Sequence, residues 1–326
     1  MGISDHEYVL PRCRGGKTET VDMREFTLKP EGDLTLDCRE YRPEGDPVGI
    51  LQVIHGLGEH QGRYVSFARF LAENGFAAYT SDLPGHGPAA AETGSLGRFP
   101  RGGWLQAAEA QHALLERVKG LWPGKPVFLF GHSMGSFLAR SCLILWPGGL
   151  QGCILCGTGH LARPLVAAGS AAAEVTAKLR GEGNTSEFLR KMAFGGYNQR
   201  IPEAASPNAW ICRDEAVVAA YDADPLCGLT PSSGLIREMM RGIRLITDPA
   251  KQKRMDPELP VLFISGEEDP VGEYGAGVRR ALESFQKAGM KRAELKLYPG
   301  DRHELLNEPD RDAVCGDILA WLKAHE

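Results

Sequence analysis

A serine between two glycines is the first sign of chemistry in this sequence. In the segment Gly131-His132-Ser133-Met134-Gly135, Ser133 directly follows the apolar run Val127–Phe130 and precedes an amphipathic stretch that begins at Ser136. A strand, a tight turn and a helix in this order are typical of a nucleophile elbow. The motif alone is weak in a chain with 40 glycines, so the interpretation depends on this context. We predict that Ser133 is a nucleophile at a helix N-terminus, where free N–H groups favour negative charge.

A nucleophilic serine needs a base, and two histidines are candidates. In enzymes with such an elbow, the chain order is Ser, then Asp or Glu, then His. Of the nine histidines, only His303 and His325 lie well downstream with room for an acid before them. His325 is the penultimate residue, where fraying is expected. His303 follows the predicted strand Leu295–Tyr298 and a turn, which predicts a loop beyond a strand end and favours His303.

The acid that orients the histidine is expected on the loop after the preceding strand. The predicted strand Val261–Ser265 leads into Gly266-Glu267-Glu268-Asp269-Pro270. Spacing alone does not choose between Glu268 and Asp269. The acid would hold the imidazole in one tautomer and stabilise the imidazolium.

The donors for an oxyanion are predicted at the end of another strand. The apolar run Val48–Ile54 leads into His55-Gly56-Leu57-Gly58, whose glycines let the backbone turn. The N–H groups of Leu57 and Met134 then form a pair that binds the substrate oxygen. A dinucleotide-binding turn is excluded, because the spacing to Gly62 is one residue too long.

Alternating strands and helices must position these residues. The predicted strands are Phe26–Leu28, Leu34–Arg39, Val48–Ile54, Phe76–Ser81, Val127–Phe130, Cys153–Cys156, Val261–Ser265 and Leu295–Tyr298. The predicted helices between them are Tyr64–Glu73, Leu105–Val118, Phe137–Leu145, Gly277–Lys287 and Arg311–Lys323. Several strands are apolar on both faces, which favours an α/β fold with a mostly parallel eight-stranded sheet and helices on both faces.

About 100 residues interrupt this alternation. Between Thr158 and Asp256 the sequence predicts only helices, at Leu165–Leu179, Glu187–Phe194, Asp214–Ala220 and Ser233–Leu245. So long a stretch is not expected to be a loop. We predict a helical cap subdomain at 158–256, a core formed by 21–157 and 257–326, and an N-terminal arm at 1–20.

Composition limits the class of protein. The net charge is −5 and the pI is near 6.0, which argues against a nucleic-acid partner. The uncharged stretch Ser141–Ala162 is broken by Trp146–Gly149, so we expect no transmembrane segment. The polar N-terminus lacks the apolar core of a signal peptide. These features predict a soluble, cytoplasmic protein.

The eight cysteines are too few for a disulfide scaffold in a chain of this length. Cys153 and Cys156 form a Cys-x-x-Cys pair, but they lie in an apolar run that predicts a buried strand. No second pair completes a metal site. We therefore expect buried free thiols, and neither a metal nor an organic cofactor.

Four motifs occur in order along the chain. They are His55-Gly56-x-Gly58-Glu59-His60-x-x-Arg63-Tyr64, Asp82-x-x-Gly85-His86-Gly87, Gly131-His132-Ser133-Met134-Gly135-Ser136 and Tyr298-x-Gly300-x-x-His303-Glu304. Together they closely resemble the monoacylglycerol lipase / lysophospholipase branch of the α/β-hydrolases, which is grouped with the serine aminopeptidases. The resemblance runs from about Arg24 to Leu322.

The resemblance implies roles for individual residues. It makes Asp269, which ends a Gly-x-x-Asp run, the acid, and it implies that residues around the elbow and the oxyanion loop shape the site rather than react. Those residues are His55, Gly56, Gly58, Glu59, His60, Arg63, Gly131, His132 and Gly135. Pro88 departs from the family pattern after Gly-His-Gly, which affects a loop near the cap.

The expected activity is hydrolysis of a small-molecule acyl ester, such as a monoacylglycerol or lysophospholipid, through an acyl-enzyme. The cap would form the acyl pocket and would contact a lipid surface transiently. Its candidate lining residues are Ala167, Ala168, Ala171–Ala173, Leu235, Ile236, Met239, Met240 and Ile243.

Two alternatives stay open. An aminopeptidase would need a cap carboxylate to bind a free amino terminus. The candidates are Glu187, Glu203, Asp214, Glu215, Asp222 and Asp224. A non-catalytic binding protein on a hydrolase scaffold typically loses a member of the catalytic triad, and none is missing here.

Overall fold

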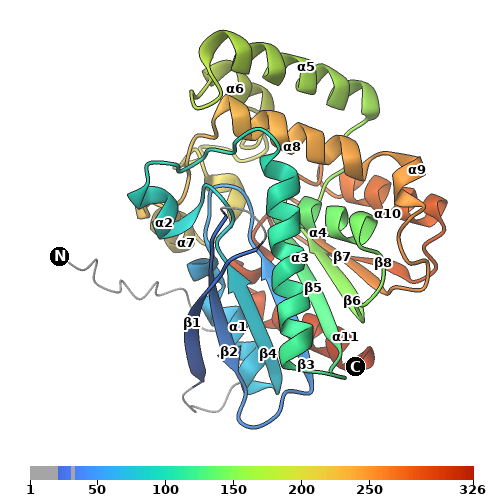
Figure 1. The fold of residues 1–326 in the computed structure, drawn as a ribbon. Coiled ribbons are helices and arrows are strands. Elements are labelled where there is room, and N and C mark those ends of the chain that lie inside the picture. Colours follow the sequence, from blue (N-terminus) through green and yellow to red (C-terminus); the bar gives the residue numbers. More distant parts are fainter. Residues whose placement is uncertain (1–20, 31–33) are drawn as a thin grey trace.

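The computed structural model describes residues 21–30 and 34–326. The predicted arm at 1–20 lies outside the described residues. Figure 1 shows a twisted sheet with helices on both faces and further helices at one end.

The central sheet has eight strands in the order β1-β2-β4-β3-β5-β6-β7-β8. Their bounds are β1 Asp22–Leu28, β2 Leu36–Arg42, β3 Gly49–Ile54, β4 Phe76–Ser81, β5 Val127–His132, β6 Gly152–Cys156, β7 Val261–Gly266 and β8 Ala293–Tyr298. Strand β2 pairs antiparallel with β1 and β4, and all other pairs are parallel. The prediction of a mostly parallel eight-stranded sheet is confirmed.

Helices cover both faces because the central strands are apolar on both sides. Successive residues of β5 point to opposite faces. Phe128 and Phe130 pack with α1 (Val65–Glu73) and α11 (Arg311–Ala324). Leu129 packs on the other face, in the cluster that also includes residues of α3 (Gly103–Leu121), α4 (Met134–Leu145) and α10 (Ala276–Ala288). Because these strands are parallel, their carboxyl ends and the loops that follow lie at one edge of the sheet.

Two short α-helices were not predicted, α2 (Gly87–Glu92) in the core and the single turn α9 (Pro249–Gln252) at the end of the stretch between β6 and β7. Helix α2 follows the Gly-His-Gly run, with Pro88 in its first turn. Proline is well suited to that position, because its ring sets φ and the first turn needs no N–H from it. The departure from the family pattern at Pro88 thus coincides with a helix start.

The stretch between β6 and β7 is helical, and we call residues 158–256 the helical insertion. It contains α5 (Arg163–Arg180), α6 (Glu187–Phe194), the 3-10 turn η2 (Ala209–Ile211), α7 (Glu215–Ala223), α8 (Ser233–Ile246) and α9 (Pro249–Gln252). Within its described residues the insertion forms no strand, only an isolated bridge between Thr185 and Ser232. Helices α5, α6 and α8 lie at the top of the view in Figure 1.

Helix α8 connects the insertion to the core. Ile236 and Ile243 are buried in the same cluster as Leu138 of α4 and Trp104 of α3. Helix α5 packs on α8. The insertion is thus anchored through α8, with α5 as an outer layer.

The described residues also bear on two expectations, one about the cysteines and one about a transmembrane segment. The seven described cysteines are all buried and free, as expected from their apolar surroundings. Among the helices of the described ranges, none combines the length and the apolar character that crossing a membrane requires.

Candidate active site

Ser133 lies in a strained turn between β5 and α4. Its φ of 52° and ψ of −121° are unfavourable for a residue with a side chain. The turn is held by two backbone hydrogen bonds of 2.9 Å: Ser133 N–H donates to the carbonyl of Cys156, and the Ser133 carbonyl accepts from the N–H of Ser136. The strain places the serine at the start of a helix, as expected for a nucleophile elbow.

The two glycines of the elbow are explained by close backbone contacts. A Cβ at Gly131 would lie 2.4 Å from the carbonyl oxygen of Gly135. A Cβ at Gly135 would lie 2.2 Å from the carbonyl oxygen of Ile54 in β3. Helix α4 passes β3 so closely that no side chain fits at either position.

His303 follows β8 and is paired with Asp269. Its Nδ1 lies 3.0 Å from both carboxylate oxygens of Asp269, which is fully buried after β7. Asp269 also accepts from the hydroxyl of Ser265 (3.2 Å) and the N–H of Val271 (2.9 Å). Although burial raises the pKa of Asp269, His303 and the hydrogen bond from Val271 lower it below its ordinary value. The acid therefore remains a carboxylate beside the imidazole.

Of Glu268 and Asp269, between which spacing did not choose, one contacts His303. Glu268 is exposed, and its backbone N–H donates to the carbonyl of Asp301 at 2.8 Å. Asp269 is the residue that the structure brings to His303.

The imidazole of His303 contacts two other rings. The ring centroid of His132 is 4.7 Å away, and that of Trp210, from η2 of the insertion, is 5.0 Å away. Trp210 was not predicted as a site residue. The sequence offered no signal for it, because it lies in the insertion, outside the four motifs.

The predicted oxyanion donors line the same cavity as Ser133 and His303. Met134 is the first residue of α4, so its N–H has no partner one turn earlier in the helix. Leu57 lies in the loop after β3, next to Gly58, which has a φ of 71°. The carbonyl of Gly58 accepts from the hydroxyl of Tyr221 (2.8 Å) and the N–H of Gly228 (2.9 Å), both from the insertion.

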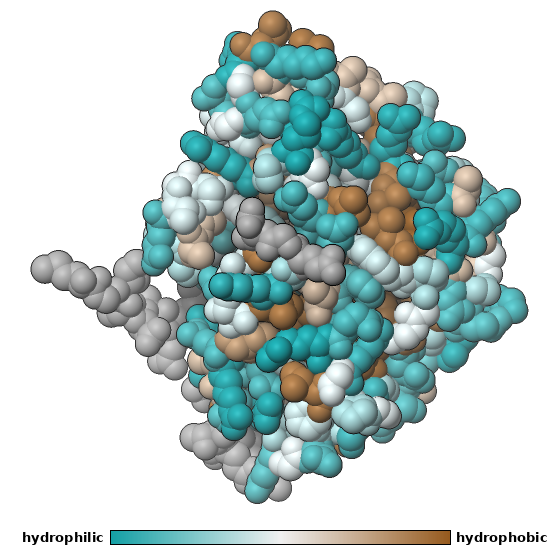
Figure 2. Space-filling model, in the orientation of Figure 1, coloured by the Kyte–Doolittle hydropathy of each residue, from teal (hydrophilic) through white to brown (hydrophobic). Residues whose placement is uncertain are grey.

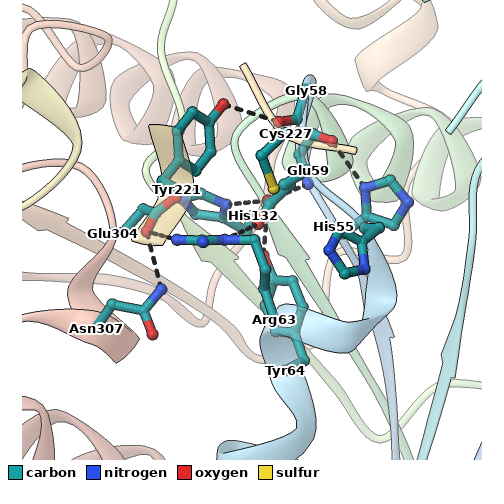
Figure 3. Close-up of polar contacts among 12 residues, drawn as sticks. His55, Gly58, Glu59, Arg63, Tyr64, His132, Tyr221, Cys227, Glu304 and Asn307 are labelled. Carbon is teal, nitrogen blue, oxygen red and sulfur yellow. Dashed lines mark hydrogen bonds and ion pairs between the residues drawn. The ribbon is translucent and has the colours of Figure 1, made fainter. Parts of the chain in front are cut away.

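A buried carboxylate links the oxyanion loop to the elbow. One oxygen of Glu59 accepts from the N–H of Gly56, from Nδ1 of His132 (2.8 Å) and from the hydroxyl of Tyr64 (2.9 Å). Figure 3 shows these contacts around Glu59. Loop and elbow are thus tied to one side chain.

Arg63 extends this buried network to the histidine loop. Its guanidinium lies 3.6 Å from Glu59 and forms a hydrogen-bonded ion pair with Glu304 (Figure 3). Glu304 also accepts from the side chain of Asn307 at 2.9 Å. The residue after the paired histidine is therefore connected to the oxyanion loop.

His132 has acceptors at both ring nitrogens. Its Nδ1 faces Glu59, and its Nε2 lies 3.3 Å from the carbonyl oxygen of His303. Only the imidazolium donates from both nitrogens. Burial lowers the pKa of His132, but Glu59 outweighs burial, and the net shift is upward. In turn, burial raises the pKa of Glu59, while His132 and Arg63 bring it well below its ordinary range.

The pKa of His55, unlike that of His132, is lowered. Its Nε2 accepts from the N–H of Leu83 (2.9 Å), so the proton is on Nδ1, which donates to the carbonyl of Gly56 (2.7 Å). Burial lowers the pKa of His55 to about 4. A neutral, fully bonded imidazole shapes the loop and has no free nitrogen for chemistry.

A cavity of about 650 Å³ opens on Ser133, Met134, Leu57 and His303. Most of its wall comes from the insertion and is apolar. Among the wall residues are Leu165, Ala168, Ala172, Met192, Phe194, Ile236, Met239, Met240, Ile243 and Ile246. Of the lining residues expected from the sequence, Ala168, Ala172, Ile236, Met239, Met240 and Ile243 contact the cavity. Ala167, Ala171, Ala173 and Leu235 are not in its wall.

Two groups of side chains bring three possible metal ligands together, and both are already engaged. In the first, Nδ1 of His60 accepts from the N–H of Gly62 (3.2 Å), so Nε2 carries the proton and donates to Asp224 (2.9 Å). Cys227 donates to the same carboxylate at 3.4 Å. A metal at Nε2 would require an imidazole without any proton, which this geometry does not favour.

The second group is Asp301, Glu308 and Asp310. The guanidinium of Arg213 already lies among these carboxylates and pairs with each of them. Its distances to Glu308 and Asp310 are 2.9 and 2.7 Å. The arginine, which belongs to the insertion, therefore occupies the place a cation would take.

A family model and known proteins match this sequence over most of its length. The family model described as serine aminopeptidase, S33, matches residues 45–310. The monoacylglycerol lipase of Mycolicibacterium smegmatis is 28% identical over 303 residues, or 92% of this chain and 97% of that protein. The monoglyceride lipase of Homo sapiens is 28% identical over 291 residues, or 88% of this chain and 86% of that protein.

A solved structure is similar over the same extent. It is the crystal structure of a highly thermostable carboxyl esterase from Bacillus coagulans in complex with glycerol. It matches with a TM-score of 0.87 at 31% sequence identity, covering 94% of this chain and 99% of that chain. The similarity thus extends over core and insertion alike.

Proposed function

The chain belongs to the serine aminopeptidase S33 family and has the α/β-hydrolase fold, and on that premise we propose that it hydrolyses carboxylic esters of single acyl chains. Monoacylglycerols are the favoured substrates. Ser133, Asp269 and His303 act as the catalytic triad. The relatives that are themselves monoacylglycerol or monoglyceride lipases support this proposal.

The mechanism has two acyl-transfer steps. His303 takes the proton of the Ser133 hydroxyl as its oxygen attacks the ester carbonyl, and Asp269 holds the Nδ1–H of the imidazole. The N–H groups of Leu57 and Met134 donate to the oxyanion of the tetrahedral intermediate. His303 then protonates the leaving alcohol, the acyl group stays on Ser133, and water releases it by the same steps.

The apolar cavity that opens on Ser133 is the observation on which the proposed class of substrate depends. Its wall of leucine, isoleucine, methionine and alanine side chains suits a hydrocarbon chain. The polar side chains in its wall include the neutral groups Asn208, Thr230 and Thr247. The cationic Arg190 of the wall is paired with Glu187 at 2.6 Å. This lining favours a small uncharged headgroup such as glycerol.

The cavity favours an ester over a peptide with a free amino terminus. The acidic residues in its wall are Glu59 and Glu304, and both are ion-paired with Arg63. The six insertion carboxylates named above as candidates for an aminopeptidase do not belong to the described wall. A substrate ammonium group would therefore have no unpaired carboxylate to bind.

The outer helices of the insertion suit contact with a lipid surface. In Figure 2, hydrophobic atoms gather at the top of the molecule, over α5 and α6. The exposed apolar side chains of these helices are Leu165, Val175, Leu179, Phe188 and Met192. Leu165 and Met192 are also part of the cavity wall, so the apolar surface continues into the cavity. We assign the acyl entrance, and the role of a cap, to this part of the insertion.

A series of purified substrates tests the proposed function. Monoacylglycerols of increasing chain length, a lysophospholipid and an aminoacyl-nitroanilide are compared with wild type and Ser133→Ala. We expect hydrolysis of monoacylglycerols, with kcat/KM rising with chain length until the cavity is filled, and no hydrolysis by the variant. Turnover of the nitroanilide without turnover of any ester would overturn the proposal.

A further inference from the structure

Trp210 contacts the imidazole of His303, and the segment that carries it is firmly docked. Arg302, the residue before His303, donates from its guanidinium to the carbonyls of Ala209 (2.7 Å) and Cys212 (3.0 Å). Glu304, the residue after His303, donates its N–H to the carbonyl of Ile211 at 2.7 Å. Both chain neighbours of His303 therefore bind the backbone around Trp210.

The next residues of the insertion continue this docking. Arg213 pairs with Asp301, Glu308 and Asp310, all on the loop that carries His303. The thiol of Cys212 lies 3.3 Å from the carbonyl oxygen of Asn307. Residues 209–213 thus form a continuous strip along residues 301–310.

Trp210 is also held by residues of the insertion itself. Tyr197 packs edge-on against it, with ring centroids 4.8 Å apart, and the backbone N–H of Trp210 donates to the side chain of Asn198 at 3.0 Å. His303 also contacts His132, which belongs to the elbow. The imidazole is therefore in contact with one ring of the core and one ring of the insertion.

From this arrangement we propose that Trp210 is a positioning residue, which keeps the His303 ring in the plane where Nδ1 meets Asp269 and Nε2 is directed toward Ser133. The inference rests on the proposed function, because it gives the insertion a part in the same reaction. Asp269 alone leaves the ring free to tilt about its hydrogen bond. Contact with the rings of His132 and Trp210 restricts that freedom, and small displacements of a reacting group lower the rate considerably.

Kinetics with a short, water-soluble acyl ester separate positioning from acyl binding. Trp210→Leu keeps an apolar side chain but removes the aromatic face, and we expect kcat to fall about tenfold with KM nearly unchanged. Trp210→Phe restores most of kcat. Arg302→Gln, which releases η2, has the same effect as Trp210→Leu. An unchanged kcat in Trp210→Leu, with a loss only in KM for long-chain esters, would show that Trp210 is merely cavity wall.

Tryptophan fluorescence gives a readout that does not depend on ester hydrolysis. Protonated imidazole quenches an indole in contact with it, so the emission of Trp210 should follow the protonation of His303. Trp146 and Trp321 also pack against histidines, His112 and His325, with centroids 4.3 and 4.4 Å apart. Their titrations cancel in the difference between wild type and Trp210→Phe.

We expect this difference signal to titrate with pH in wild type and to lose its titration in His303→Gln. The control Trp122→Phe, whose indole donates to Tyr79 and not to a histidine, leaves the titration in place. A difference signal that is flat with pH would overturn the contact and with it the positioning role. If the protein failed to hydrolyse esters but retained the titration, the proposed function would be wrong and the contact would stand.

Discussion

The side chain of His132 lies against the backbone of His303: its Nε2 is 3.3 Å from the His303 carbonyl oxygen, and its other nitrogen faces Glu59. The residue before the candidate nucleophile thus contacts the backbone of the candidate base. The charge of His132 and the position of His303 are therefore linked, which makes the Glu59–His132 pair the first target for experiment.

The Glu59–His132 pair predicts a pH-dependent stability. Because the pKa of His132 is raised in the folded protein, its contribution to the free energy of unfolding is fully present below about pH 6.5 and is lost as pH rises through the raised value. Glu59→Gln keeps the shape and removes the charge. The stability difference between wild type and Glu59→Gln, from urea denaturation, should therefore shrink as the pH rises above about 6.5.

The same measurement on His132→Gln serves as the control, and its stability difference from wild type should shrink over the same pH range. A stability difference that grows or stays constant over that range would mean that His132 is neutral in the folded protein.

Substitution of Asp269 and Glu268 tests the assignment of the acid. Loss of the carboxylate leaves His303 without its orienting partner, so Asp269→Ala should lower kcat by roughly 10⁴-fold. Glu268→Ala should keep near-full activity, because Glu268 is exposed and away from His303. A reversed result would assign the role to Glu268.

A fluorophosphonate probe tests the nucleophile. Wild type should be labelled and Ser133→Ala should not. The outcome is independent of the substrate, and an unlabelled wild type would favour a non-catalytic binding protein on this fold.

The activity of wild type should fall as the pH is lowered, because only the neutral imidazole of His303 accepts the serine proton. The measurement is kcat/KM against pH for a soluble short-chain ester. A profile that stays flat through the range in which histidine titrates would exclude His303 as the general base.

The close contact of α4 with β3 predicts a large effect of one methyl group. Gly135→Ala would place a Cβ 2.2 Å from the carbonyl oxygen of Ile54, and we expect a loss of about 3 kcal/mol in the free energy of unfolding. The control is Gly120→Ala in α3, where a Cβ meets nothing within 4 Å. A helical glycine without such a contact should gain about 0.5 kcal/mol on the same change. Equal stability of the two variants would contradict the steric explanation of the elbow.

The candidate catalytic residues were predictable as far as each follows an apolar strand. Ser133 follows β5 and His303 follows β8, so chain order and strand ends were sufficient to find these two. For the acid, they indicated only the turn after β7. The choice of Asp269 over Glu268 from the residues alone was not possible, since it depends on how one turn directs two neighbouring side chains. The resemblance supplied what spacing did not, and Asp269 is the residue that lies 3.0 Å from Nδ1 of His303.

The contribution of the insertion was much less predictable. Periodicity located the helices α5 to α8, but it carries no information on which helix packs where. Trp210 and Arg213 approach the histidine loop only through long-range packing, and neither lies in a motif. The roles of Glu59 and Arg63 were expected to be architectural, and the structure adds that they connect three separate loops.

The way the insertion is attached has a consequence for altering selectivity. It is held at Gly58 by Tyr221 and Gly228 and along residues 301–310 by residues 209–213, whereas α5 packs outward on α8. The stretch that docks against the loop of His303 and the outer helices α5 and α6 are thus different parts of the insertion, although both contribute to the cavity wall. Exchange of α5 and α6 between homologues would then transfer the preference for acyl-chain length. The positions of Ser133, Asp269 and His303 in the recipient protein would stay unchanged.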